Sequence, residues 1–148
     1  MAGVDYILVG GVAAAAHGSV RATQDVDIVY RREPENLKRL VNALGALQPY
    51  LRGAPPGLPF RFDTETLAQG LNFTLTTSLG WIALLGEIAG GGKFEDLAPH
   101  ALTVEVFGVK CLILDLPSLI QTKRAMGRAK DLEAVAELEV IRERMQRS

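Results

Sequence analysis

Residues 6–30 constrain the fold more than any other part of the chain. The apolar run at 6–9 is typical of a buried strand, and it leads directly into a glycine pair at 10–11. An alanine-rich stretch at 12–16 follows, and alanine is the strongest helix former. Residues 25–30 then alternate polar and apolar side chains before turning apolar, which predicts a second strand. The order of strand, glycine turn, short helix and strand predicts a domain that mixes helices with a sheet.

The remainder of the chain extends this pattern. Apolar spacing of three and four predicts helices, and period-two alternation predicts strands. The patterns assign helices to 34–44, 64–68, 94–97, 117–126 and 132–145, and strands to 71–76, 81–85 and a hairpin over 102–114. Nothing in the sequence divides the chain with a linker. We therefore expect one α/β (α+β) domain over residues 1–148, with a mixed sheet flanked by helices and a helical C-terminus.

Composition excludes several classes of protein. Apolar residues make up 48% and charged residues 22%, and the formal net charge is -1. This balance is typical of a soluble globular domain and argues against extensive nucleic-acid contact. The single cysteine, Cys111, lies in an apolar run, which excludes an internal disulfide and predicts a buried thiol. We expect a cytoplasmic protein with no membrane segment, because the first residues lack the basic start of a signal peptide and the longest uncharged stretch, 67–86, is rich in polar residues.

Asp25 and Asp27 are the first candidates for chemistry. Alternate residues of a strand point to the same side, so their carboxylates share a face, with Cα atoms about 6–7 Å apart. The apolar neighbours Val26 and Ile28 would bury the opposite face. Mg²⁺ commonly binds one or two carboxylates together with substrate phosphates, so this pair suits a divalent metal that presents a nucleoside triphosphate. An Asp-x-Asp pattern also occurs by chance at solvated strand ends.

Gly10 and Gly11 strengthen the metal–phosphate interpretation. They lie between a strand and a helix, where glycine lets the backbone approach a ligand closely. Free N–H groups at the start of the following helix suit a phosphate. A tight turn without a ligand would need the same glycines, so the pair alone does not decide between the two.

Together these features resemble the nucleotidyltransferases of the DNA polymerase β superfamily, and within it the small bacterial group of minimal nucleotidyltransferases and abortive-infection-type toxins. The matching residues are Val9-Gly10-Gly11, His17-Gly18, Arg21, Thr23 and Asp25-Val26-Asp27. The resemblance implies a nucleotidyltransferase fold in which Asp25 and Asp27 hold Mg²⁺ (or Mn²⁺). It also implies that Gly10, Gly11, Arg21 and Thr23 contact the nucleotide. His17 could contact the nucleotide, or it could have a structural role at the end of the helix with its ring bonded to a backbone carbonyl, and we prefer the structural role.

A second stretch supports the resemblance near the C-terminus. This bacterial group often carries a lysine followed by Arg-x-Lys-Asp, which here corresponds to Lys123 and to Arg128-Ala129-Lys130-Asp131. The resemblance implies that Lys123 contacts the triphosphate as part of the catalytic set, with Asp131 beside the nucleotide. A solvated charged face remains the alternative for Lys123 and Asp131, and it is the preferred interpretation for Arg124.

The implied reaction transfers a nucleoside monophosphate from a nucleoside triphosphate to an acceptor hydroxyl or similar group and releases pyrophosphate. The acceptor could be a transfer RNA or other RNA, a protein or a small molecule. The family also uses a third carboxylate, and the residue at the matching position is Ala83. Glu105 or Glu87 could supply that carboxylate. Otherwise the chain would be a catalytically silent nucleotide-binding or regulatory module, such as one that acts on the cognate partner of a toxin–antitoxin pair.

The proline- and glycine-rich segment 48–59 predicts a long irregular loop. Long loops in compact domains are often functional. With Arg52 inside it and Arg61 nearby, this loop could contribute an acceptor surface.

Overall fold

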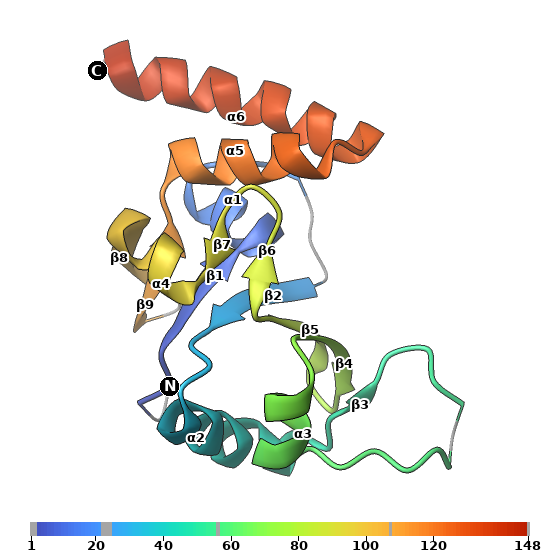
Figure 1. The fold of residues 1–148 in the computed structure, drawn as a ribbon. Helices are drawn as coiled ribbons and strands as arrows, with labels where there is room; N and C mark the ends of the chain where they lie inside the picture. The colour runs from blue at the N-terminus through green and yellow to red at the C-terminus, as the bar shows by residue number, and fades with distance from the viewer. Residues whose placement is uncertain (1–2, 22–24, 56, 107, 148) are drawn as a thin grey trace.

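A seven-stranded mixed sheet carries the fold in the computed structural model, which describes residues 3–21, 25–55, 57–106 and 108–147 (Figure 1). Across the sheet the strands follow the order β3 (Tyr50–Leu51), β4 (Asn72–Thr77), β5 (Gly80–Leu85), β2 (Asp25–Tyr30), β1 (Tyr6–Val9), β9 (Val109–Leu114) and β8 (Ala101–Val106). Strand β2 runs antiparallel to β1 and parallel to β5, while β1 runs parallel to β9. A separate hairpin joins β6 (Glu87–Ile88) to β7 (Gly92–Lys93). The expected mixed sheet is confirmed.

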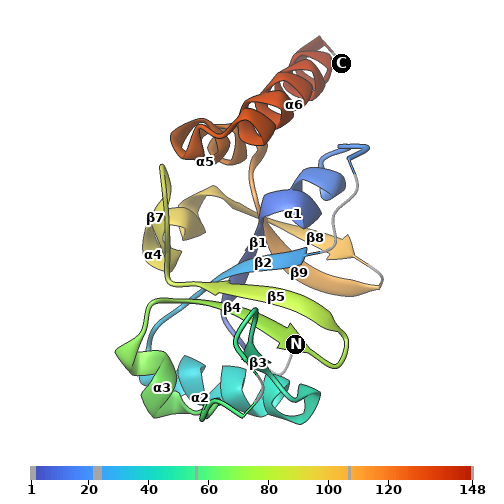
Figure 2. The same cartoon turned by 90° about the vertical axis from the view of Figure 1, so that its right-hand side faces the viewer.

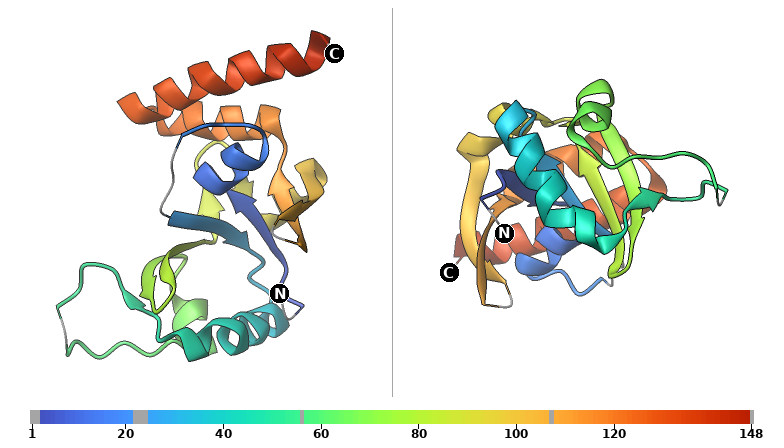
Figure 3. Two further views of the ribbon diagram at one scale, coloured as in Figure 1. Left: turned by 180° about the vertical axis from the view of Figure 1, so that it is seen from behind. Right: turned by 90° about the horizontal axis from the view of Figure 1, so that it is seen from below.

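Helices flank the sheet at two ends. They are α1 (Gly10–Ala16), α2 (Pro34–Leu44), α3 (Thr64–Gln69), α4 (Phe94–Leu97), α5 (Leu116–Met126) and α6 (Ala129–Arg147), with short 3₁₀ turns η1 (Gly45–Leu47) and η2 (Ala98–His100). Helices α5 and α6 stack across one end of the molecule, and α2 and α3 lie at the other, with the sheet between them (Figures 1 and 2). The segment between β3 and α3 extends away from the sheet (Figure 3).

Local sequence signals set the bounds of helix α5. Asp115 caps α5 by accepting a 2.9 Å hydrogen bond from the backbone N–H of Ser118, and Pro117 stands in the first turn, where its missing N–H costs nothing. Gly127 ends the helix at φ +68°, a left-handed conformation that glycine adopts without strain. The chain then turns directly into α6, so that the two helices form an antiparallel pair.

One hydrophobic core joins these elements. Its fully buried side chains come from the central strands and from the helices on both sides of the sheet, and the largest include Ile7, Tyr30, Leu84, Leu119 and Leu138. Burial of such side chains stabilises the fold by roughly 1.5–3 kcal/mol each relative to exposure. Cys111 is buried on β9, as expected for a structural thiol.

Three expectations about local structure need correction. Helix α1 begins at Gly10, so the glycine pair forms its first turn instead of preceding it. The segment 48–59 is not wholly irregular, because Tyr50 and Leu51 pair with β4 as an edge strand. Val26 is 36% exposed, so apolar cover on the far side of β2 starts only at Ile28.

The C-terminal helix also departs from its expected apolar stripe. Val135 and Leu138 are buried, as the spacing predicts, whereas Leu132 and Met145 are more than half exposed. The residue buried at the start of α6 is instead Asp131. Among the residues described, no helix combines the length and the apolar character needed to cross a membrane.

Candidate active site

A cavity of about 690 Å³ lies between the sheet and the C-terminal helix pair. Its walls come from the turn of β1 into α1, from strands β2, β4 and β5, and from helices α5 and α6. Five cationic side chains line it: Arg21, Arg52, Lys123, Arg128 and Lys130. Five acids line it as well: Asp25, Asp27, Glu87, Asp131 and Glu137. Two distant parts of the sequence, near residues 10–27 and 122–138, therefore meet at one site.

Strand β2 presents both of its aspartates to this cavity. Asp25 and Asp27 line the cavity wall, as two residues of one strand face should. On the neighbouring strand β1, the last residue, Val9, is the register partner of Asp27. The carboxylate of Asp27 thus lies beside the point where β1 becomes α1.

Gly10 is required at that point by geometry. Its φ of +65° lies in the left-handed region, where a side chain is strained. A Cβ added to Gly10 would also overlap the carboxylate of Asp27. Glycine at this position therefore lets the backbone turn and lets an acid lie against it, and both Gly10 and Gly11 line the cavity.

The electrostatic environment of Asp27 favours a nearby cation. Burial raises the pKa of Asp27 above its ordinary value, and the negative charge of Asp25 raises it further. Lys123, Arg52 and Lys130 lower the pKa but do not offset these effects. A positive ion between the two carboxylates would remove the repulsion.

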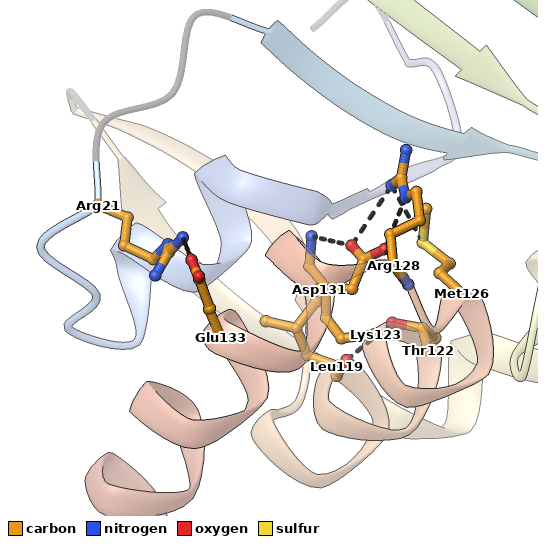
Figure 4. A network of polar contacts seen from close by, with 8 residues as sticks. All are labelled: Arg21, Leu119, Thr122, Lys123, Met126, Arg128, Asp131 and Glu133. Carbon is orange, nitrogen blue, oxygen red and sulfur yellow. Dashed lines mark hydrogen bonds and ion pairs between the residues drawn. The ribbon is translucent and has the colours of Figure 1, made fainter.

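Lys123 and Arg128 are organised around a buried acid (Figure 4). Asp131 is 1% exposed; its carboxylate accepts a 2.6 Å hydrogen bond from Arg128 Nε and lies 3.9 Å from Lys123 Nζ. The hydrogen bond from Arg128 is the main cause that lowers the pKa of Asp131, so this side chain is ionised at neutral pH. A solvated charged face is therefore the wrong interpretation for Asp131, which fixes two cations at the wall of the cavity. Arg124, by contrast, is exposed and pairs with Glu139 outside the cavity.

The segment after α1 is fastened to α6. Ser19 Oγ donates a 2.6 Å hydrogen bond to Glu137 Oε1, and the backbone N–H of Val20 donates to Oε2 of the same residue at 3.1 Å. Arg21 lines the cavity but pairs with Glu133 at 3.2 Å (Figure 4). Thr23, the other expected nucleotide contact in this segment, lies outside the described residues.

His17 has the structural role that we preferred for it. Its Nε2 lies 2.8 Å from the carbonyl oxygen of Leu114 and donates to it. This hydrogen bond ties the end of α1 to the end of β9, ahead of α5.

The expected position of the third carboxylate is occupied by alanine. Ala83 on β5 is the register partner of Asp27 on β2, is buried, and lines the cavity. Glu105 faces Lys110 on the β8–β9 hairpin and does not line the cavity. Glu87 does line it, from β6 beyond the end of β5. Within the described ranges, no group of three or more His, Cys, Asp or Glu side chains is placed to hold a metal ion.

Arg52 lines the cavity and lies against Trp81, an arrangement that the sequence only half indicates. Arg52 Nη1 lies 3.4 Å from Asp25 Oδ2, and the guanidinium carbon lies 4.5 Å from the centroid of the Trp81 ring. The backbone N–H of Arg52 bonds to Thr74, which continues the pairing of β3 onto β4. Trp81 is the register partner of Asp25, a relation that only the strand pairing reveals.

Asp25 and Asp27 fit one divalent metal ion. Both are oxygen donors on one face, burial and then the charge of Asp25 raise the pKa of Asp27, and the absence of a side chain at Gly10 lets the Asp27 carboxylate lie against the backbone. Two protein carboxylates leave the remaining positions of a Mg²⁺ ion for water and for phosphate oxygens.

Comparison with known proteins identifies the fold. No family model matches the sequence, and no curated protein matches it. Among solved structures, this chain is similar to the lincomycin-bound lincosamide antibiotic adenylyltransferase LnuA. The similarity covers 93% of this chain and 87% of the LnuA chain, with a TM-score of 0.59 and 13% identity. The chain is also similar to TM1012 from Thermotoga maritima, which is assigned to the nucleotidyltransferases. This similarity covers 99% of this chain and 84% of the TM1012 chain, with a TM-score of 0.50 and 16% identity. The chain has the nucleotidyltransferase fold, as the sequence predicted.

Proposed function

We propose that this chain is a metal-dependent nucleotidyltransferase. It binds a nucleoside triphosphate with Mg²⁺ or Mn²⁺, transfers the nucleoside monophosphate to an acceptor and releases pyrophosphate. The observation that carries the proposal is the meeting of Asp25, Asp27 and Gly10 with Lys123 at the wall of one cavity. The fold shared with two solved nucleotidyltransferases supports it.

Each part of the cavity has a role in this reaction. Asp25 and Asp27 hold the metal ion, which when bound supplies positive charge to the triphosphate. Lys123 contacts the triphosphate as a point charge, and Asp131 keeps both Lys123 and Arg128 turned toward the cavity. Gly10 and Gly11 let the backbone of α1 approach the phosphates, with Arg21 and Thr23 as further nucleotide contacts. Catalysis is then mainly positioning and charge neutralisation.

The acceptor is drawn from three classes: RNA such as transfer RNA, a protein, and a small molecule. LnuA is a lincosamide adenylyltransferase whose structure holds lincomycin, which makes a small molecule a natural first acceptor to test. Residues of β4 and β5 line the cavity together with Arg52, and we place the second substrate against this acceptor side.

The proposal is tested by transfer of label from the α-phosphorus of each nucleoside triphosphate to transfer RNA, to a protein mixture and to lincomycin. We expect label transfer only with Mg²⁺ or Mn²⁺, and a loss of at least about 100-fold in Asp25→Asn/Asp27→Asn, since removal of charge stabilisation commonly costs that much. The matched control Glu105→Gln/Glu143→Gln removes two acids away from the cavity and should transfer at the wild-type rate. Full transfer by the aspartate variant would contradict the proposal.

A second candidate function follows from Ala83. With alanine in place of an acid as the register partner of Asp27, the chain could bind nucleotide without turnover and act as a regulatory module on a partner, such as the cognate member of a toxin–antitoxin pair. Loss of a general base costs roughly 10²–10⁴-fold in rate. Ala83→Asp separates the two functions: a large gain of transfer to a hydroxyl acceptor would show that the remaining site is competent, and no gain would favour the silent module.

A further inference from the structure

The acceptor side of the cavity carries the cation Arg52, and the nearby acids Asp25 and Asp27 are the proposed metal ligands. Thr74 on β4, Ala83 on β5 and Asp27 on β2 form one register row across the sheet. In that row the only acid is Asp27, which the proposed function commits to the metal. Glu87 lies four residues beyond Ala83, past the end of β5 and outside the row. A hydroxyl acceptor in this row would find no carboxylate to take its proton except one that the proposed function assigns to the metal.

Arg52 offers the opposite chemistry from a base. Its Nη1 faces Asp25, and its guanidinium carbon lies over the Trp81 ring, 4.5 Å from the centroid. Its Nε and Nη2 are buried and make no hydrogen bond to any group that the structure describes. These two nitrogens form the side edge of the guanidinium, which binds a carboxylate or phosphate through two parallel hydrogen bonds.

Buried charged donors without acceptors are costly, so the side edge of Arg52 calls for an anionic partner. Asp25 does not meet this need, since it lies against Nη1 while Nε and Nη2 remain without a hydrogen-bond partner. Cavity-lining Thr74 and Asn72 flank the same region with neutral groups, and the Oδ1 atom of Asn72 is already bonded to the backbone N–H of Gly86.

We propose that the acceptor is an oxyanion, a phosphate monoester or a carboxylate, and that Arg52 is the residue that selects it. The inference rests on the proposed function and narrows its acceptor. An ionised acceptor oxygen forms a bond to the α-phosphorus of the triphosphate while the bond from that phosphorus to the bridging oxygen of the β-phosphate breaks. Pyrophosphate leaves with the electron pair, and the product is an anhydride. No proton has to be removed, so an alanine at position 83 suffices.

Binding of the acceptor group can be measured without turnover, because Trp81 is the only tryptophan of the chain and lies against Arg52. The probes are glycerol 3-phosphate, glycerate and glycerol, which differ in the charged group. We expect saturable changes in tryptophan fluorescence with one or both anions and none with glycerol. The stronger of the two anions identifies phosphate or carboxylate as the natural group. Equal responses to glycerol and to the anions would overturn the inference.

Variants of Arg52 locate the effect. We expect Arg52→Gln to weaken anion binding at least 10-fold, and Arg52→Lys to weaken it less, because lysine keeps the charge but loses the paired donors. Arg124→Gln is the matched control, since Arg124 is exposed, pairs with Glu139 and does not line the cavity. Circular dichroism establishes that each variant folds, and the indole N–H resonance of Trp81 provides a second reporter. Unchanged anion affinity in a folded Arg52→Gln protein would overturn the inference.

Transfer from Mg²⁺-ATP gives an independent readout. Glycerol 3-phosphate has a second pKa of about 6, so the rate of transfer to it should stay level between pH 7 and 9, whereas the rate of transfer to a hydroxyl acceptor would rise with pH. Ala83→Asp should lower the affinity for the anions by like-charge repulsion. If the triphosphate fails to bind at all, the proposed function fails while the anion titration still decides the role of Arg52. If the triphosphate binds and Arg52 variants keep their anion affinity, only the present inference fails.

Discussion

At the scale of single residues, Gly10 and Asp27 depend on each other. A side chain at position 10 would be strained at φ +65° and would overlap the Asp27 carboxylate. We expect Gly10→Ala to lower the free energy of unfolding by about 1–3 kcal/mol and to weaken Mg²⁺-dependent binding. Denaturant unfolding followed by circular dichroism measures the first effect.

Gly45→Ala is the control for this change. Gly45 has φ -57° and open space where the added Cβ would lie. Its replacement should leave stability unchanged or raise it by up to about 1 kcal/mol. Equal losses in both variants would mean that the backbone at Gly10 is not specially constrained.

Asp131 is the residue on which the cationic wall depends. Asp131→Asn removes a charged acceptor from Arg128 and Lys123, and we expect a loss of about 1.5–3 kcal/mol in the free energy of unfolding at pH 7. Glu143→Gln, which breaks only the exposed pair with Arg147, should change stability by less than about 0.5 kcal/mol.

The stability difference between the wild type and Asp131→Asn has a defined pH dependence. The pKa of Asp131 is lowered on folding, so its stabilisation is present above the unfolded value of 3.8 and is lost as pH falls through the folded pKa. The difference in unfolding free energy between wild type and Asp131→Asn should stay level from pH 7 to about pH 5 and shrink below pH 3.8. A difference that grows on acidification would show that the carboxylate is not the source of the stabilisation.

At the scale of elements, helix α6 positions the segment that leads to Asp25. Glu137 accepts two hydrogen bonds from Ser19 and Val20, and the bond from Ser19 is the main cause that lowers the pKa of Glu137. Glu137→Gln weakens both bonds, since a neutral amide is a poorer acceptor than a carboxylate. We expect a several-fold loss of triphosphate affinity, measured by calorimetry, with Glu143→Gln on the same helix as the unchanged control.

Elements were predictable where a single local pattern decided them. Strands β1 and β2 match their expected ranges, and α5 starts and ends at its proline and glycine signals. Edge strand β3 was missed because two residues are too short for a period to show, and its pairing with β4 is decided by residues far along the chain.

The site divides in the same way. Gly10, Gly11, Asp25, Asp27 and Ala83 lie in short motifs, and the strand register places Ala83 beside Asp27 as the motif implied. The cation–π contact of Arg52 with Trp81 and the burial of Asp131 could not be derived from spacing. Both result from contacts between elements whose separation in the sequence carries no periodic signal.

At the scale of the whole molecule, the cavity lies between the sheet and the C-terminal helix pair, so that each of them forms one of its walls. A ligand that contacts both walls binds only the folded chain and therefore stabilises it. At a triphosphate concentration of 100 times Kd the gain is about 2.7 kcal/mol. For a chain of this size we expect a rise in Tm of about 5–10 °C with Mg²⁺-ATP.

Thermal shifts of two variants test whether both walls are used. Asp25→Asn/Asp27→Asn, which alters the sheet wall, should abolish the rise in Tm caused by Mg²⁺-ATP. Lys123→Gln, which alters the helix wall, should reduce that rise. An unreduced rise in Tm for Lys123→Gln would show that α5 is not part of the binding site and would leave the metal site on β2 unaffected.

The central claim is that Asp25 and Asp27 form a metal-dependent nucleotide site, and calorimetric titration of each nucleoside triphosphate tests it most directly. We predict saturable binding in the presence of Mg²⁺ or Mn²⁺, at least 10-fold weaker binding after removal of the metal with chelator, and loss of binding in Asp25→Asn/Asp27→Asn. The control Glu105→Gln/Glu143→Gln should bind as the wild type does. Binding that is equally strong without metal or in the aspartate variant, or no binding of any triphosphate by the wild type, would contradict the claim.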